Sequence, residues 1–129
     1  MLSLKLGVVG SRRRNSIKDK KLLKEFIYKA KQLFGNLELI SGGCPKGADR
    51  FADEIAYELN IPIINHYPDK SKLSSNPKRY EFTKIYYDRN ILIAKDCDCL
   101  VALVAYDRKG GTEHTIKETI KLGKKVIIL

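Results

Sequence analysis

Short apolar runs along this chain alternate with stretches in which apolar residues recur three and four positions apart. The runs predict five strands, over Leu4–Val9, Leu37–Ile40, Ile61–Asn65, Cys99–Ala105 and Lys125–Leu129. The helical spacing predicts four helices, over residues 22–34, 48–59, 82–95 and 112–122. The polar segment 67–81, which carries two prolines, is the longest expected loop.

This alternation of strands and helices is typical of an α/β domain. Neighbouring parallel strands need a crossover connection that packs on one face of the sheet, and such crossovers are right-handed. We therefore predict a three-layer fold in which a five-stranded parallel sheet carries helices on both faces. A chain of 129 residues has room for one core, so residues 1–129 are expected to form a single domain.

Three glycine-containing turns follow predicted strands. Gly10-Ser11-Arg12 follows the first strand, Ser41–Arg50 the second and Lys109–His114 the fourth. Glycine lets the backbone come close to an anion, and the free N–H groups at the start of the following helix attract negative charge. Ligands of open α/β sheets bind beyond the carboxyl ends of the strands, so we expect the three turns to form one phosphate-binding site.

Several residues of these turns are candidates for contact with a ligand. Lys46 brings a point charge into the second turn, and Asp49 either orders this loop or accepts a hydrogen bond from a ribose. Arg50 starts a helix, where a cation is unfavourable unless an anion or carboxylate lies nearby. The candidate ligand-binding residues in the turns are Gly10, Ser11, Arg12, Ser41, Gly42, Gly43, Lys46, Gly47, Asp49, Arg50, Gly110, Gly111 and Thr112.

The charge of the chain favours anionic partners. There are 25 Lys and Arg against 15 Asp and Glu, a formal net charge of +10. Nucleotides, nucleic acid and acidic surfaces all satisfy such an excess, and a solvated helix face accounts for much of the lysine between Lys18 and Lys31. The charge alone therefore leaves the kind of anion open.

The cysteines and the apolar content argue against several other classes. Cys44, Cys97 and Cys99 are odd in number and lack a C-x-x-C pair, so we expect neither a disulfide nor a metal site. No apolar stretch approaches the roughly 20 residues that span a bilayer, and the chain starts on a strand rather than a signal peptide. A cytoplasmic protein with no membrane partner and no cofactor is expected.

The motifs, taken in order, resemble a known family. Gly10-Ser11-Arg12, Ser41-Gly42-Gly43 with Gly47-Ala48-Asp49-Arg50, Arg89-Asn90 and Gly110-Gly111-Thr112 are similar to the YspA-like branch of the SLOG superfamily. Its relatives include DprA, the lonely-guy phosphoribohydrolases and molybdenum-cofactor carrier proteins. The resemblance implies a Rossmann-like fold that binds a nucleotide or nucleotide-derived ligand at the strand ends, often as a dimer. It also adds Arg89 and Asn90 to the candidate ligand-binding residues.

The resemblance bears on catalysis as well. Related phosphoribohydrolases use an Arg ahead of the last glycine turn, which Arg89 resembles, and a Glu three residues after the Thr of P-G-G-x-G-T-x-x-E. That Glu position falls on Thr115 or Lys117 here. Cleavage of an N-glycosidic bond builds positive charge at the sugar, which a carboxylate stabilises. Glu113 and Asp49 are the substitutes, so Arg89 and Glu113 are the catalytic candidates only if the protein is an enzyme.

Three functions from different classes remain. The first is a sensor or carrier that holds a nucleotide-derived small molecule, and it is the one we favour because the usual catalytic carboxylate is missing. The second is a nucleotide N-glycosidase. The third is a DprA-like binder of single-stranded nucleic acid, which we expect to be weak and non-specific because only net charge supports it.

The third predicted helix, over residues 82–95, also suggests a homodimer. Between Phe82 and Ala94, apolar residues surround more of the helix than one core-facing stripe requires. Small domains bury only about two-thirds of their surface on folding, so a second copy is a natural cover for such a face. This contact would place Arg89 near the junction of the two subunits.

Overall fold

The computed structural model describes residues 2–129, and residue 1 of the predicted domain lies outside them. The elements in chain order are β1 (Ser3–Gly10), α1 (Ile17–Leu33), β2 (Asn36–Ser41), α2 (Ala48–Leu59), β3 (Ile63–Asn65), the 3-10 turn η1 (Lys70–Lys72), α3 (Arg79–Asp96), β4 (Cys99–Leu103), α4 (Gly111–Lys121) and β5 (Lys125–Ile128).

The five strands form one parallel sheet in the order β3-β2-β1-β4-β5. Strand β1 is central, and its Gly7 lies opposite Ile40 of β2 and Leu100 of β4. The predicted fold class is confirmed: the molecule is a three-layer, Rossmann-like α/β fold. Because all the strands point the same way, their carboxyl ends lie along one edge of the sheet.

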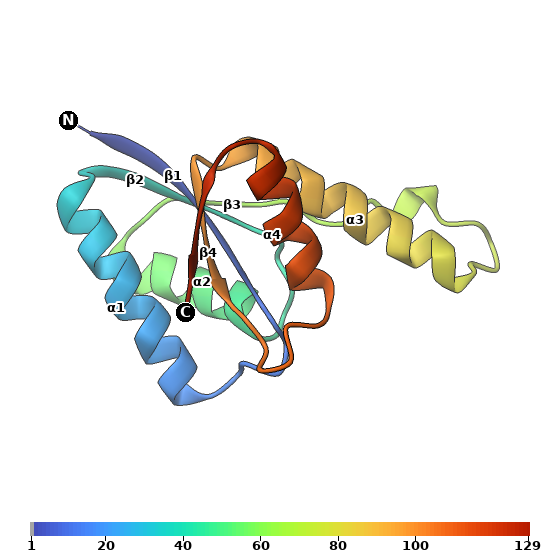
Figure 1. Cartoon of the computed structure of the whole chain (residues 1–129), viewed down its shortest axis with the longest axis horizontal. Coiled ribbons are helices and arrows are strands. Elements are labelled where there is room, and N and C mark those ends of the chain that lie inside the picture. The colour runs from blue at the N-terminus through green and yellow to red at the C-terminus, as the bar shows by residue number, and fades with distance from the viewer. Residues whose placement is uncertain (1) are drawn as a thin grey trace.

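Each face of the sheet has its own apolar core. Helices α1 and α2 cover one face, where Leu23 and Phe51 pack against Leu6 and Val8 of β1. Helices α3 and α4 cover the other, where Ile93 and Ile116 form a cluster with strand residues (Figure 1). The strand residues of this second cluster are Val9, Ile40, Leu100 and Ala102. Alternate residues of one strand thus serve opposite cores, as the pleat requires.

Two helices begin earlier than the apolar pattern predicts, because polar caps start them. Helix α1 begins at Ile17 behind the N-cap Ser16, whose hydroxyl accepts the backbone N–H of Asp19 while the Asp19 carboxylate accepts that of Ser16. At α3, the Glu81 carboxylate accepts the backbone N–H of Lys78 at 2.6 Å. Neither cap is apolar, so hydrophobic spacing alone misses the first turn.

The strands differ from expectation at their ends. Strand β3 begins at Ile63 rather than residue 61, because Ile61 donates its N–H back to Ala56 at the end of α2. Strand β4 ends at Leu103, before the expected Ala105. The start of α3 and the segment before it extend away from the sheet, at the right of Figure 1. The expected 67–81 loop therefore contains η1 and the first residues of α3.

Gly10 and Gly111 should respond differently to alanine. A Cβ on Gly10 would lie 2.6 Å from Cβ of Ala48 and 2.9 Å from Cβ of Leu103, whereas a Cβ on Gly111 meets nothing within 4 Å. We expect Gly10→Ala to lower the free energy of unfolding by about 1–3 kcal/mol through overpacking. Gly111→Ala, in the first turn of a helix, is the control and should stay within about 0.5 kcal/mol of the parent. Urea denaturation measures both, and equal values would contradict the close approach of β1 to α2.

Candidate ligand-binding cleft

A cavity of about 510 Å³ opens at the carboxyl ends of the central strands. The chain leaves β1 toward the α1 face and leaves β4 toward the α4 face, so neither connection covers the gap between these two strands. The turn after β1, the loop after β2, helix α3 and the turn before α4 form the walls. Residues of all three glycine turns therefore line this one cavity.

Most of the candidate residues line this cavity. They are Gly10, Ser11, Arg12, Lys46, Asp49, Arg89, Asn90, Gly110, Gly111 and Thr112. Gly42 and Gly43 line a smaller adjacent cavity. Ser41 is fully buried at the end of β2.

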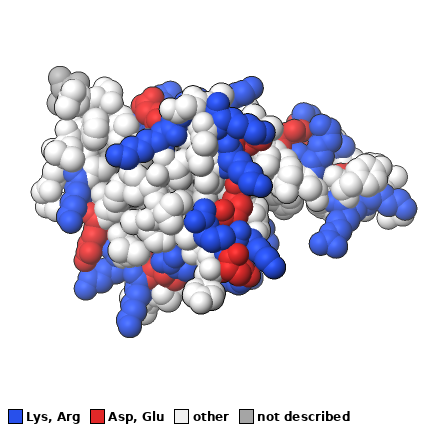
Figure 2. Space-filling model, in the orientation of Figure 1, with Lys and Arg blue, Asp and Glu red and all other residues white. Residues whose placement is uncertain are grey.

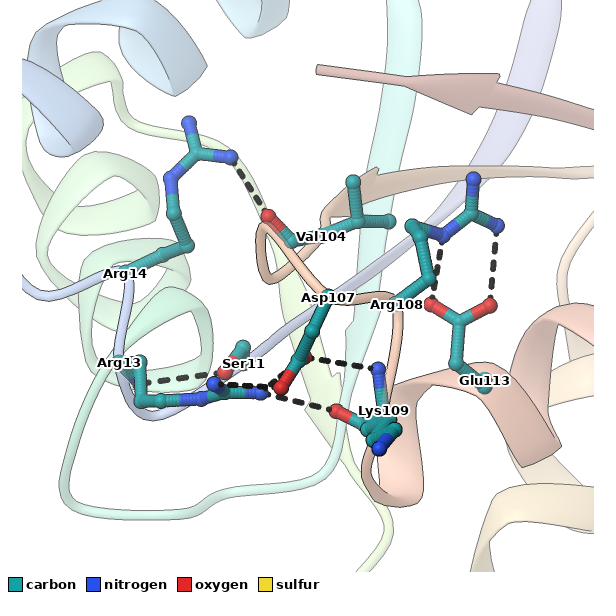
Figure 3. Close-up of polar contacts among 8 residues, drawn as sticks. All are labelled: Ser11, Arg13, Arg14, Val104, Asp107, Arg108, Lys109 and Glu113. Atoms are coloured by element: carbon teal, nitrogen blue, oxygen red, sulfur yellow. Dashed lines mark hydrogen bonds and ion pairs between the residues drawn. The ribbon is translucent and has the colours of Figure 1, made fainter.

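Besides Ser41, three candidates lie outside both cavities. The backbone N–H of Gly47 donates to the Asn15 side chain at 3.0 Å, so this glycine shapes the loop instead of facing the cavity. Arg50 donates to the same Asn15 oxygen at 3.3 Å, and its guanidinium lies over the Phe51 ring. Glu113 forms two hydrogen bonds of 2.9 Å with Arg108 (Figure 3). The positive charge of Arg50 at the start of α2 is thus contacted by the side-chain oxygen of Asn15 and by the Phe51 ring.

The start of α4 leaves free donors at the cavity wall. Its N-cap is Gly110, with φ of 119°, and no side chain caps this end of the helix. An α-helix leaves its first N–H groups without intrahelical partners, and its amino terminus carries a partial positive charge. Gly111 and Thr112 supply the first of these groups, so this wall is suited to an anion.

Arginines hold the turn after β4 in place (Figure 3). The guanidinium of Arg13 donates to both carboxylate oxygens of Asp107, at 2.6 and 3.1 Å, and to the carbonyl oxygen of Lys109 at 3.3 Å. Arg14 donates to the carbonyl oxygen of Val104 at 2.9 Å. Two of the three consecutive arginines are therefore structural, and the pair between Arg13 and Asp107 joins the turns on both sides of the cleft.

The cavity has a marked excess of positive charge. Arg12, Lys46, Arg89 and Lys109 line it, and within residues 2–129 none of them forms an ion pair. The one carboxylate among the described lining residues is Asp49. Unpaired cations around a concave site concentrate anions there.

Arg89 connects α3 to the ends of two strands. Its Nη1 donates to the carbonyl oxygen of Gly42 at 2.7 Å and to that of His66 at 3.4 Å, and its Nε donates to Asn90 at 3.0 Å. A Cβ on Gly42 would lie 2.6 Å from this Nη1. Gly42 is therefore needed for the approach of Arg89.

Asn90 makes the corresponding connection to α4. Its side-chain Nδ2 lies 3.4 Å from the carbonyl oxygen of Gly111, to which it donates, and 3.3 Å from Nδ1 of His114. The His114 ring stacks on Tyr87, with centroids 3.8 Å apart. Burial lowers the pKa of His114, which favours the neutral ring that accepts this hydrogen bond.

Asp49 orders the second glycine loop. Its carboxylate accepts the backbone N–H of Cys44 at 3.1 Å. Burial raises the pKa of this carboxyl, while the Cys44 N–H and the positive charge of Arg89 act in the opposite direction. The first of the two roles that the sequence leaves open for Asp49 is therefore present in the structure.

Several further residues line the cavity without being among the candidate ligand-binding residues. Tyr86, Tyr87 and Ile93 share a face of α3 with Arg89 and Asn90, and Thr115 and Lys109 flank the α4 turn. The spacing of residues 86, 89, 90 and 93 is that of one helix face, which is a signal that the sequence already contains. Thr115 is buried and lines the cavity.

Solved structures share this fold. The molybdenum cofactor binding protein from Rippkaea orientalis has a TM-score of 0.70 and 22% identity, and the match covers 99% of this chain and 77% of that one. The molybdenum cofactor carrier protein from Chlamydomonas reinhardtii has a TM-score of 0.68 and 17% identity, with 98% and 76% covered. At this identity the likeness establishes the Rossmann-like fold that the family resemblance implies.

The sequence matches no protein-family model and no curated protein significantly. Across residues 2–129, no three His, Cys, Asp or Glu side chains are grouped as metal ligands. None of the helices in the described part is both long and apolar enough to cross a membrane.

Substitutions of Asp49 separate its hydrogen bond from its charge. Asp49→Asn keeps an acceptor for the Cys44 N–H, whereas Asp49→Ala removes it. We expect Asp49→Ala to be less stable than Asp49→Asn by about 1–2 kcal/mol in urea denaturation. Equal stability of the two variants would contradict a structural role for the hydrogen bond.

The pH dependence of the same variants tests the raised pKa of Asp49. A raised pKa means that the folded protein holds this proton more tightly than the unfolded chain does. The stability linked to the proton is present in acid and is lost as the pH rises through the raised pKa. The free energy of unfolding of Asp49→Asn should therefore rise relative to that of the parent as the pH increases. A difference that is constant with pH would contradict the prediction.

Proposed function

We propose that this protein binds a nucleotide or a nucleotide-derived phosphate compound in the cleft and holds it, as a sensor or carrier. The observation that carries the proposal is the combination of four unpaired cations with the uncapped amino terminus of α4 around one cavity. Such a site recognises a phosphate through backbone N–H groups and point charges. The fold-level analogy to cofactor binding and carrier proteins supports a holding role.

The arrangement of carboxylates also favours holding over cleavage. Glu113 is engaged with Arg108 outside the cavity, and the cavity wall carries Thr115, one of the two residues onto which the hydrolase Glu position falls. Asp49 lines the cavity, but its carboxylate is engaged with the backbone N–H of Cys44. Hydrolysis of an N-glycosidic bond therefore stays the alternative, with Arg89 as its remaining catalytic candidate.

Calorimetric titration with inorganic phosphate, ribose 5-phosphate, nucleoside monophosphates and ADP-ribose tests the proposal. Lys46→Gln and Lys109→Gln should each weaken phosphate-compound binding about tenfold, or about 1.4 kcal/mol, because each removes an unpaired cation from the site. Lys29→Gln is the matched control. Lys29 is exposed on α1, and its substitution changes the net charge by the same amount away from the cavity. Equal effects of all three substitutions would show that net charge, not this cavity, drives binding.

The bound compound should be recovered unchanged by chromatography after incubation with the protein. Rapid release of free base, abolished by Arg89→Ala, would instead establish the hydrolase alternative.

Lys and Arg side chains are spread over the face shown in Figure 2 rather than gathered along one groove. Weak, salt-dependent binding of nucleic acid stays a prediction from net charge.

We also propose self-association through the outer side of α3. Ile85, Ile93 and Ala94 of the suggested contact are buried in the core. Around the rest of this helix, 38% of Phe82, 43% of Tyr87 and 49% of Leu92 are nevertheless exposed, with Tyr87 at the rim of the cavity. Exposed apolar side chains in this number on one helix favour a protein contact.

Light scattering should report a dimer for the parent protein, and Leu92→Lys should shift it toward monomer by placing a charge in the contact. Ile17→Lys is the control, because Ile17 is 90% exposed on α1. A monomer at all micromolar and higher concentrations, or dissociation by both variants alike, would overturn the α3 contact.

A further inference from the structure

A second cavity of about 350 Å³ lies beside the first. The two cavities share four wall residues, Arg12, Cys44, Tyr86 and Arg89. A group bound in one cavity is therefore adjacent to a group bound in the other, with the two arginines at their boundary. The phosphate-binding wall at α4 belongs to the first cavity only.

The second cavity is lined by the aromatic residue Tyr67, which is positioned by the pairing of β3 with β2. Tyr67 follows β3, where His66 donates its N–H to the carbonyl oxygen of Ser41. The Tyr67 ring lies on Gly43, because a Cβ there would be 2.2 Å from the ring. Gly43 also has φ of 70°, which favours glycine. Tyr67 is nevertheless 64% exposed, so much of its surface is open to a ligand.

The lining of this cavity combines flat apolar surfaces with hydrogen-bond donors. Tyr67, Tyr86 and Pro68 supply the flat surfaces, and the Arg89 guanidinium lies 5.5 Å from the centroid of the Tyr86 ring. Lys70 adds a further cation, and no carboxylate is among the described residues that line the cavity. Aromatic surfaces stack on planar rings, and cations donate to their acceptor edges.

We infer that the second cavity is a subsite for a planar heterocycle that carries hydrogen-bond acceptors, joined to a phosphate held in the first cavity. The inference rests on the proposed function, which supplies the phosphate site, and assigns Tyr67 and Lys70 to recognition of the ring. The ligand class is thus a phosphate ester of a heterocyclic compound rather than a simple sugar phosphate. Tyr67 provides the stacking surface, and Lys70 donates to the ring.

Titration of ribose 5-phosphate beside AMP, GMP, CMP and UMP tests the subsite. We expect at least one nucleotide to bind more tightly than ribose 5-phosphate. Tyr67→Ala should weaken that nucleotide about tenfold and leave ribose 5-phosphate unchanged, because only the nucleotide stacks. Tyr67→Phe keeps the ring and should retain the affinity. Tyr57→Ala is the control, since Tyr57 is an exposed tyrosine outside both cavities.

The outcomes separate this inference from the proposed function. If ribose 5-phosphate and all four nucleotides bind alike and Tyr67→Ala weakens none of them, the subsite is overturned while the phosphate site stands. If neither these five compounds nor inorganic phosphate and ADP-ribose bind, the proposed function fails and the subsite falls with it. Should Tyr67→Ala fail to fold, Lys70→Gln provides the second variant: selective loss of nucleotide affinity supports the subsite, and no change overturns it.

Discussion

The two directions in which the chain winds outward from β1 are the constraint on which the site depends. Right-handed crossovers place α1 and α2 on one face of the sheet as the chain passes to β2 and β3, and place α4 on the other as it passes from β4 to β5. The ends of β1 and β4 are left uncovered between them. The cavity, its free N–H groups and its cations all occur at this point, where α3 of the β3–β4 connection forms one wall.

Arg89 turns this gap into a defined cleft. Its hydrogen bonds to Gly42 and His66 fix α3 against the ends of β2 and β3, and Asn90 extends the connection to α4. These partners are carbonyl oxygens and amides, so the guanidinium is positioned without being neutralised. A cation that is held in place and still charged is favourable for binding an anion, and it costs little to organise when the ligand arrives.

A shared fold does not carry a shared chemistry, and the carboxylates show why. The frame that supports the glycine turns also places Thr115, a neutral side chain, at the wall of the cavity. Glu113, two residues earlier on α4, points its carboxylate to Arg108 instead. On a helix, a shift of two residues moves a side chain to another face. The carboxylate of Glu113 therefore does not reach the part of the wall that Thr115 lines.

The sequence by itself determined the strands, the helices and the glycine turns at the strand ends, because apolar period and turn chemistry are local properties. Right-handed crossovers then restricted the topology enough for the fold to be predicted. Which turn residues share a cavity was decided only in three dimensions. Arg50 and Glu113 belong to the right motifs but find partners, Asn15 and Arg108, that turn them away.

The tertiary structure also decided what else reaches the ligand. Tyr67 lies far from the second glycine loop in the sequence, yet its ring rests on Gly43 because β3 pairs with β2. The purpose of Gly42 likewise depends on a residue of α3. A glycine in a sequence shows that something must come close to the backbone, but only the packing of distant elements shows what does.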